Sequence, residues 1–208
     1  DGDQDRLMPL AIAGLALAWA AMLLFGGMEF DRALLLFAYA GRDPNLAQAA
    51  RWLTELGGFP VLIAATGGGG ALLLWRRDWR SALLLVAVTL SGRLLVELQK
   101  DWTARLRPDA NEHLVAAQSL AFPSGHAANA TLVWLALALL LPMPERARPF
   151  AVWGAVWLAL AIGASRVMLG VHWPSDVIAG WSFGLLWLLL LLRLAGHGEE
   201  GTAPSPAH

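Results

Sequence analysis

The sequence has no cysteine, a single lysine and few charged residues of either sign. Without cysteine, disulfides and thiolate chemistry are excluded, and thiol usage says nothing about the redox compartment. Charged residues make up 15% of the 208 positions and hydrophobic residues 57%. The mean hydropathy of +0.54 is too high for an ordinary soluble domain. A net charge of -1 also offers no broad basic surface for nucleic acid. The composition therefore predicts a polytopic membrane protein that does not bind nucleic acid.

Six apolar segments are candidates to cross a bilayer, for which a helix needs about 20 residues. We expect one all-α membrane domain over residues 1–208, with a polar segment at 1–6 and a polar, disordered tail at 196–208. The first apolar run follows mostly acidic residues and is long for a signal peptide, so it is interpreted as a span. The six spans are expected at residues 7–28, 57–75, 81–98, 123–141, 150–169 and 177–194.

Residues 29–56 mix charged and apolar positions at helical spacing around a Gly-Arg-Asp-Pro turn. They predict short helices at the membrane interface, an amphipathic connector in preference to a lid. The glycines at 67–70 favour close helix contact or a local break in the second span, and no Lys-Ser/Thr follows them to form a phosphate loop. In the third span Arg93 and Glu97, four residues apart, are expected to neutralise each other.

Arginines gather in two short loops, after the second and fourth spans, and indicate the cytoplasmic side. These are Arg76, Arg77 and Arg80, and then Arg146 and Arg148. With six spans both termini lie on that side. The end of the third span, the start of the fourth and the junction of the last two then share the opposite face, where we expect them to form one site.

The first two polar clusters suit a phosphate group. Lys100 is the only lysine, and Arg107 precedes Pro108, which keeps the chain extended there. Ser124 and Gly125 lie at the start of a predicted helix, whose free N–H groups attract phosphate oxygens. His126, one residue further on, is placed to protonate a leaving oxygen. The alternative is a helix cap beside a buried structural histidine. Another histidine, at position 113, could substitute as the acid, but we expect it to be a surface residue without that role.

The third cluster contains Arg166, His172 and Asp176. Asp176 falls in the first turn of the predicted last helix, where its carboxylate can accept the Nδ1 proton of His172 and leave Nε2 free to attack phosphorus. Arg166 would bind the phosphate. The alternative is an aspartate cap beside a structural histidine. A metal site built from His126, His172 and Asp176 is disfavoured because the cations around it would repel a divalent ion, so neither metal nor cofactor is expected.

Together these residues resemble the three signature motifs of the type-2 phosphatidic acid phosphatase superfamily of membrane phosphatases. A lysine, six residues and Arg-Pro are matched by Lys100, Arg107 and Pro108, and Pro-Ser-Gly-His is matched by residues 123–126. Ser-Arg, five residues, His, three residues and Asp are matched by Ser165, Arg166, His172 and Asp176. The resemblance implies metal-independent hydrolysis through a phosphohistidine at His172, with His126 as the acid. Soluble haloperoxidases load the same pocket with vanadate, a use that the spans argue against.

The resemblance to small bacterial members implies a place in the inner membrane with the site facing the periplasm or the outside. It also implies a lipid substrate such as phosphatidylglycerophosphate, phosphatidic acid or undecaprenyl diphosphate, with no obligatory protein partner. Three alternatives stay open: a lipid phosphotransferase using the same phosphohistidine, a lipid A phosphatase and, less favoured, a transporter.

Overall fold

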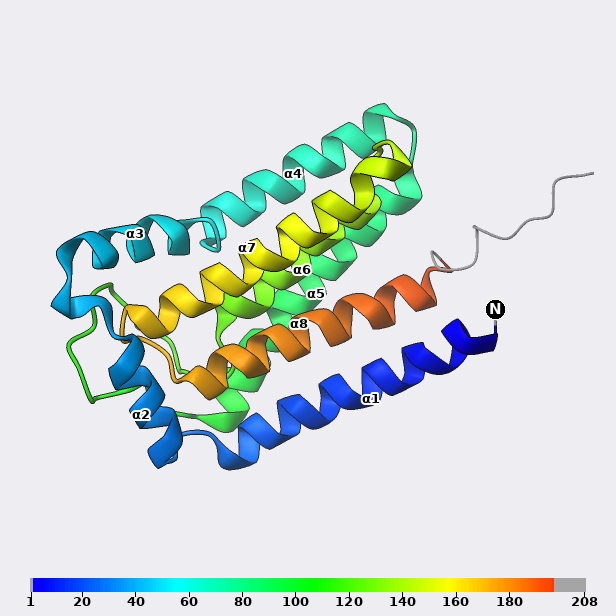
Figure 1. Cartoon of the computed structure of the whole chain (residues 1–208). Coiled ribbons are helices and arrows are strands. Elements are labelled where there is room, and N and C mark those ends of the chain that lie inside the picture. Colours follow the sequence, from blue (N-terminus) through cyan, green and yellow to red (C-terminus); the bar gives the residue numbers. More distant parts are fainter. Residues whose placement is uncertain (1, 197–208) are drawn as a thin grey trace, which may run out of the picture.

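A computed structural model describes residues 2–196, and every regular element in that range is a helix (Figure 1). Two short helices, α2 (Glu29–Ala38) and α3 (Pro44–Glu55), and two 3₁₀ turns, Ala40–Arg42 and Glu145–Ala147, join the long ones. The all-α fold with short helices between the first two spans is confirmed, whereas the prediction for residues 197–208 lies outside the described range. The long helices are α1 (Gly2–Phe25), α4 (Phe59–Trp75), α5 (Trp79–Thr103), α6 (Gly125–Leu140), α7 (Arg148–Met168) and α8 (Pro174–Leu194).

Five segments of the described chain are long and apolar enough to cross a membrane. The expected fourth span, α6, has 16 residues, a length of about 24 Å against a hydrocarbon core of about 30 Å. It is apolar and almost wholly buried by its neighbours. A short central helix leaves room at its N-terminal end, which is where the polar clusters meet. The five segments are Leu7–Phe25, Pro44–Trp75, Trp79–Thr103, Glu145–Met168 and Pro174–Leu194.

Helix α6 is the centre of the bundle and contacts α4, α5, α7 and α8, while α1 lies outside against α8. Gly180 and Gly184, one turn apart on α8, allow the closest approach. A Cβ at Gly180 would lie 2.7 Å from the carbonyl oxygen of Ser124, and one at Gly184 would lie 2.7 Å from that of Ala128. Because no side chain fits there, this Gly-x-x-x-Gly pair brings the N-terminal half of α8 against the first two turns of α6.

The four glycines at 67–70 do not break α4, which is continuous from Phe59 to Trp75. Of the two expected outcomes, the local break is therefore wrong. Close contact occurs at Gly69, where a Cβ would meet Leu137 and Leu85. At Gly67, Gly68 and Gly70 a Cβ would meet no atom of the described chain within 4 Å.

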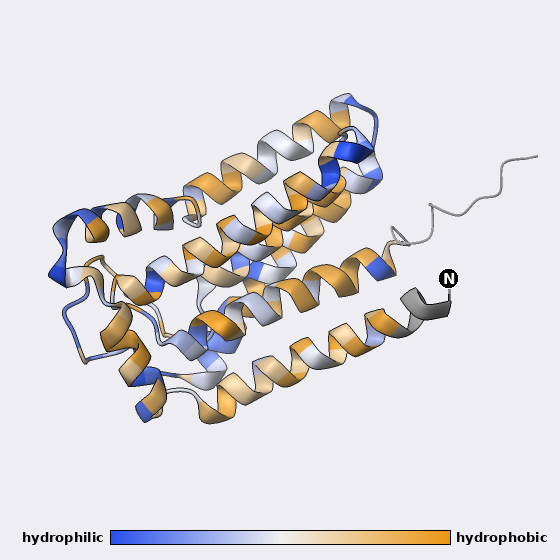
Figure 2. Cartoon of the chain, in the orientation of Figure 1, coloured by the Kyte–Doolittle hydropathy of each residue, from blue (hydrophilic) through white to orange (hydrophobic). Residues whose placement is uncertain are grey.

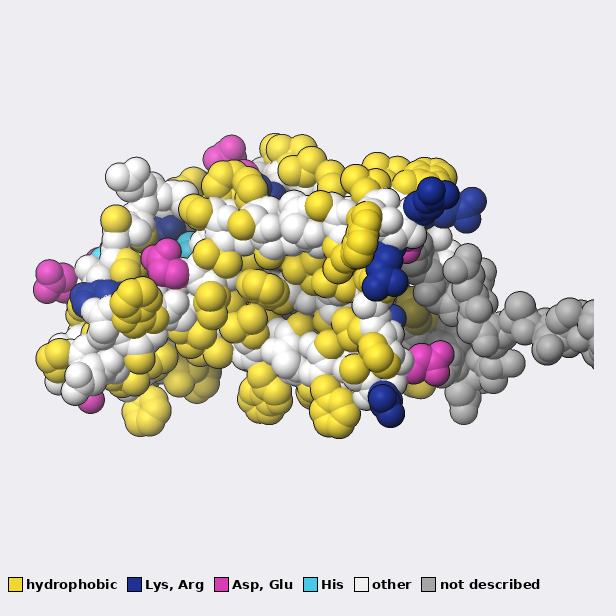
Figure 3. Space-filling model, turned by 90° about the horizontal axis from the view of Figure 1, so that it is seen from above, with side chains coloured by type: hydrophobic (Ala, Val, Ile, Leu, Met, Phe, Trp, Pro, Cys, Tyr) yellow, Lys and Arg dark blue, Asp and Glu magenta, His cyan; other side chains and the backbone are white. Residues whose placement is uncertain are grey.

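Polar residues gather at the two ends of the bundle (Figure 2), and hydrophobic side chains cover much of the middle (Figure 3). The loop 104–124, the start of α6 and the α7–α8 junction share one end (Figure 1). The α4–α5 loop and the turn Glu145–Ala147 lie at the other end, as do the start of α1 and the end of α8. The prediction that the three polar clusters share one face is confirmed.

Candidate active site

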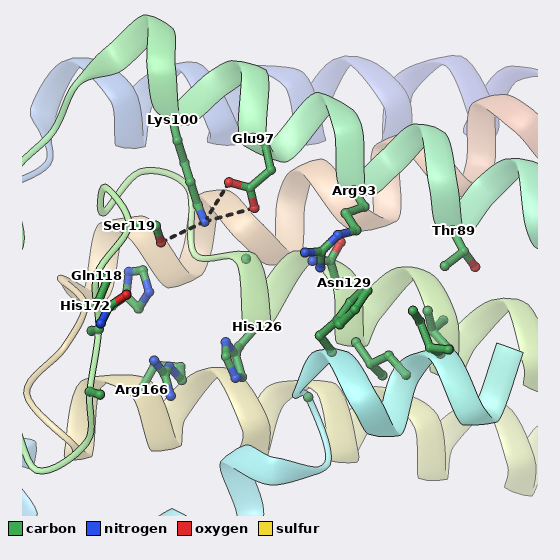
Figure 4. Close-up of a pocket in the computed structure, with 18 of the residues that line it drawn as sticks. Thr89, Arg93, Glu97, Lys100, Gln118, Ser119, His126, Asn129, Arg166 and His172 are labelled. Atoms are coloured by element: carbon green, nitrogen blue, oxygen red, sulfur yellow. Dashed lines mark hydrogen bonds and ion pairs between the residues drawn. The ribbon is translucent and has the colours of Figure 1, made fainter.

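A cavity of about 440 Å³ lies where the three polar clusters meet (Figure 4). Helix α5 contributes Lys100, the loop after it contributes Arg107, and α7 contributes Arg166. The structure thus brings most of the predicted site residues together around one cavity. Ser124 and Asp176 are fully buried and do not line the cavity. The predicted residues that do line it are Lys100, Arg107, Gly125, His126, Arg166 and His172.

Lys100 and Arg107 are held by the loop between α5 and α6. Lys100 is buried, and its Nζ lies 3.3 Å from Oε1 of Glu97 and 3.2 Å from Oγ of Ser119. Arg107 donates from Nε to the carbonyl of Ser119 at 2.6 Å and from Nη1 to the carbonyl of Val171 at 2.6 Å. Burial lowers the pKa of Arg107, but an arginine stays protonated in proteins. Arg107 therefore fastens the loop to the segment that carries His172.

His172 lies between Arg107 and Asp176. Its Nδ1 is 3.5 Å from Oδ2 of Asp176, and its Nε2 is 3.1 Å from Nη1 of Arg107. Burial, followed by the charges of Arg107, Arg166 and Lys100, lowers the pKa of His172 well below 6.5. The imidazole is therefore neutral near pH 7. Nδ1 makes no hydrogen bond to the described side chains, so Asp176 lies beside it without accepting its proton in this geometry. In the tautomer that carries its proton on Nδ1, the lone pair of Nε2 faces the cationic side of the cavity.

Helix α6 begins at Gly125 with Ser124 at its N-cap position, as expected. The Ser124 hydroxyl makes no capping bond, and it has no hydrogen-bond partner in the part of the chain whose side chains are described. The N–H of Ser124 donates instead to the carbonyl of Asp176 at 2.9 Å, which joins the starts of α6 and α8. His126 points into the cavity (Figure 4). His113 is half-buried and lies outside the cavity lining, with Nε2 2.7 Å from the carbonyl of Pro108.

Arg166 depends on an element that the sequence assigned to the interface. Its Nη1 donates to Oγ1 of Thr54 on α3 at 2.8 Å, and its Nε has no hydrogen-bond partner in the described chain. Both residues are buried. The connector between the first two spans thus orients one of the predicted phosphate-binding groups.

The predicted pairing of Arg93 with Glu97 is wrong. Glu97 binds Lys100, three residues later on α5, and the guanidinium of Arg93 lies over the ring of Phe59 with its carbon 4.1 Å from the centroid. Spacings of three and four residues both place side chains on one helix face, so the sequence offered two partners. Glu97 pairs with Lys100 because a buried charge needs a counter-charge more than the half-buried charge of Arg93 does.

Arg105, two residues before Arg107, binds the carboxylate beside His172. Its Nη1 donates to Oδ1 of Asp176 at 3.1 Å, and its Nη2 donates to the carbonyl oxygens of Met22 and Leu23 at the end of α1. The N–H of Trp173 donates to Oδ2 of Asp176 at 2.9 Å. Both carboxylate oxygens are therefore positioned by groups other than His172.

Asp31, a residue of α2 that the sequence did not single out, secures the start of α8. Its carboxylate is buried and accepts hydrogen bonds from the N–H of Ser175 at 2.9 Å, from the Ser175 hydroxyl and from the N–H of Gly27 at 2.7 Å. Ser175 is adjacent to Asp176. No sequence signal pointed to Asp31, because its partner lies 144 residues away.

Four cationic side chains and two histidines line this cavity, at one end of a bundle of apolar helices. Among the described side chains, those of residues 7–196, no group of three His, Asp or Glu converges as a set of metal ligands. Cations that converge on a small buried space are suited to a phosphate group, whose charge they stabilise. The fold and the cavity together define the class: an integral membrane enzyme that acts on phosphate esters.

Comparison with known proteins gives the same class. The sequence model of the PAP2 superfamily matches residues 81–197, and the chain belongs to this superfamily. Phosphatidylglycerophosphatase B of Bacillus subtilis (strain 168) is 34% identical over 169 residues, which cover 77% of this chain and 81% of the relative. Lipid A 1-phosphatase of Rhizobium johnstonii is 38% identical over 147 residues, 66% of this chain and 55% of the relative. The predicted family is confirmed.

A solved structure supports the fold over nearly the whole chain. The crystal structure of a transmembrane PAP2 type phosphatidylglycerolphosphate phosphatase from Bacillus subtilis matches with a TM-score of 0.84 and 30% sequence identity. The match covers 92% of this chain and 98% of that one. The chain is therefore an integral membrane phosphatase, and the predicted enzyme class and all-helical membrane fold are confirmed.

Proposed function

We propose that this protein hydrolyses a lipid phosphate at the membrane border through a covalent phosphohistidine at His172. The observation that carries the proposal is the continuity of the cavity. One part is lined by Lys100, Arg107 and Arg166, and the other runs between α4 and α5 along apolar side chains. A phosphate group and an acyl or prenyl chain would fit these two parts. The apolar lining includes Phe59, Leu62, Ile63, Leu90 and Val133.

The names of the relatives support a lipid substrate. They include a phosphatidylglycerophosphatase, a lipid A 1-phosphatase and an undecaprenyl-diphosphatase from Sulfolobus acidocaldarius. We place the substrate in the class of phosphatidylglycerophosphate, phosphatidic acid or undecaprenyl diphosphate.

In the first step Nε2 of His172 attacks phosphorus. Lys100, Arg107, Arg166 and the N–H groups at the start of α6 balance the charge of the phosphoryl oxygens. A P–N bond forms as the P–O bond to the lipid breaks, and His126 gives its proton to the departing lipid oxygen. Nη1 of Arg107 lies 3.1 Å from Nε2 of His172. When the substrate is bound, this guanidinium donates to a phosphate oxygen instead, which leaves the lone pair of Nε2 free to attack.

In the second step a water molecule releases the phosphate. His126, now neutral, takes a proton from the water as its oxygen bonds to phosphorus, and the P–N bond breaks. Inorganic phosphate leaves and His172 regains its neutral form. Asp176, 3.5 Å from Nδ1, stabilises the positive charge that the imidazole carries while it is phosphorylated.

The orientation we propose places the arginine-rich loops in the cytoplasm and the cavity at the periplasmic or outer face of the inner membrane. Absence of native cysteine makes this directly testable. A cysteine introduced at exposed Asp109 should react with a membrane-impermeant maleimide in intact cells, whereas one at exposed Glu145 should not. The reverse pattern would invert the proposed topology.

Phosphate release tests the function. Purified protein in detergent with EDTA should liberate inorganic phosphate from phosphatidic acid, and His172→Ala should lower kcat by about three orders of magnitude or more. His113→Ala, outside the cavity, is the matched control and should keep full turnover. Full activity of His172→Ala, or activity that needs an added divalent ion, would contradict the proposal. Transfer of labelled phosphate to an acceptor lipid in place of its release would identify a phosphotransferase.

A further inference from the structure

Arg93 is a cation in the cavity wall that the proposed chemistry does not use. It lies on α5 seven residues before Lys100, a separation of two turns and about 10 Å along the helix. Its expected partner, Glu97, is bound to Lys100. Among the side chains of residues 7–196, which the structure describes, no carboxylate lies at ion-pair distance from Arg93. A half-buried cation in a membrane helix without a counter-ion indicates a functional role.

Asn129 extends the same part of the wall from the other side. It lies on α6, three residues after His126, and its side chain carries two N–H donors and a carbonyl acceptor. Arg93 and Asn129 line the same cavity as His126 and His172, and Figure 4 labels all four on its wall. The contact of Arg93 with the Phe59 ring holds the guanidinium at this wall but supplies no charge to balance it.

The charges of the cavity leave room for a second anion. Its lining contains Arg93, Lys100, Arg107, Arg166 and a single carboxylate, Glu97. Lys100, Arg107 and Arg166 carry three positive charges, and the carboxylate of Glu97 neutralises one of them. The two that remain balance a terminal phosphate, whose charge is about −1.5 to −2 at pH 7. Arg93 then adds one further positive charge, which a singly charged group would neutralise.

We propose that Arg93 and Asn129 form a second anion subsite, which binds a phosphodiester of the substrate one glycerol unit away from the phosphate that is hydrolysed. This inference rests on the proposed function and narrows its substrate class. The two phosphorus atoms of a diphosphate share one oxygen, and both therefore fit near Lys100 and Arg107. Two phosphates joined through a glycerol are further apart than those of a diphosphate, and they match the two-turn separation of Arg93 and Lys100 better. The lipid selected is of the phosphatidylglycerophosphate type, whereas phosphatidic acid has no second phosphate.

The test compares kcat/KM for phosphatidylglycerophosphate, phosphatidic acid and undecaprenyl diphosphate in mixed micelles. Arg93→Gln should lower the value for phosphatidylglycerophosphate by about 10- to 100-fold, the loss expected for a charge-assisted hydrogen bond. The values for phosphatidic acid should not change. Arg93→Lys, which keeps the charge, should recover part of the loss, and Asn129→Ala should give a smaller loss in the same direction.

Arg80→Gln is the matched control. Arg80 lies on the same helix over the ring of Trp79, with its carbon 5.8 Å from the centroid, and it does not line the cavity. It should leave all three substrates unaffected. Retained turnover of phosphatidic acid by Arg93→Gln also demonstrates that the variant is folded.

Three outcomes would overturn the subsite. The first is an unchanged kcat/KM for phosphatidylglycerophosphate in Arg93→Gln, and the second is an equal loss of kcat/KM for phosphatidylglycerophosphate and phosphatidic acid. The third is a larger loss of kcat/KM for undecaprenyl diphosphate than for phosphatidylglycerophosphate. A wild-type protein that hydrolyses none of the three lipids would instead refute the proposed function, and the subsite with it.

Discussion

Asp176 is fully buried, and three different groups surround its carboxylate. Oδ1 accepts from Arg105, Oδ2 accepts from the N–H of Trp173, and Nδ1 of His172 is 3.5 Å from Oδ2. Arg105 is also bound to the end of α1 and does not line the cavity. Its effect on catalysis must therefore be indirect, through the charge and position of Asp176, which makes it a positioning residue.

Replacing Arg105 should change how the rate depends on pH. The pKa of His172 is held well below 6.5, so the neutral nucleophile persists as pH falls through 6.5 and is lost only when pH falls through the lowered pKa. Arg105→Gln leaves the Asp176 charge less balanced, which favours the imidazolium and raises the pKa of His172. The acidic limb of the kcat/KM profile should then move up by about one pH unit.

Arg105→Lys, which keeps the charge, should move the acidic limb back toward lower pH. A reduced rate in Arg105→Gln with the limb in its original place would mean that Arg105 only supports the fold. A wild-type limb near pH 6.5 would contradict the lowered pKa of His172 itself.

Between elements, the contact of α6 with α8 decides the shape of the site. Helix α6 carries Gly125 and His126, and α8 carries Asp176 in its first turn. Their starts are joined by the bond from the Ser124 N–H to the Asp176 carbonyl. The glycine at 180 makes this separation possible, because its missing Cβ would lie 2.7 Å from the Ser124 carbonyl oxygen.

Enlarging Gly180 should therefore reduce both stability and turnover. Gly180→Val forces α8 away from α6, and overpacking of this kind costs about 1–3 kcal/mol. The matched control is Gly68→Val, where the added side chain meets no atom of the described chain within 4 Å of its Cβ. Thermal unfolding and kcat for the two variants check the prediction. Equal behaviour of the two would show that the α6–α8 separation does not govern the site.

Much of the site could be predicted from local spacing, and the remainder depends on contacts between distant segments. The motif spacings and the alternation of spans were enough to bring Lys100, His126 and His172 to one end. The contacts of Arg166 with Thr54 and of Ser175 with Asp31 join residues 112 and 144 positions apart. The sequence shows the glycines at 67–70 and at 180 alike, but only the packing shows which helix face meets a neighbour.

For the molecule as a whole, the arrangement of spans was predictable because successive apolar segments that each cross the bilayer must alternate in direction. The exceptional element is α6, the central helix, whose 16 residues are fewer than a helix needs to span a bilayer. The cavity at its N-terminal end takes up the remaining depth. The cavity joins a cationic part to an apolar part between α4 and α5, so phosphate and lipid chain would be bound on opposite sides of His126. The residues that line the apolar part could not be predicted, because they depend on how α4 packs against α5.

The central claim is that His172 becomes phosphorylated during turnover. Protein mixed with a lipid phosphate labelled in its phosphate group and quenched in alkali within the first turnover should carry the label. We predict that the label is stable to alkali, lost in acid, present in EDTA, and located by peptide mapping at His172. It should be absent from His172→Ala. Turnover that proceeds without a labelled protein, or with the label on another residue, would contradict the account.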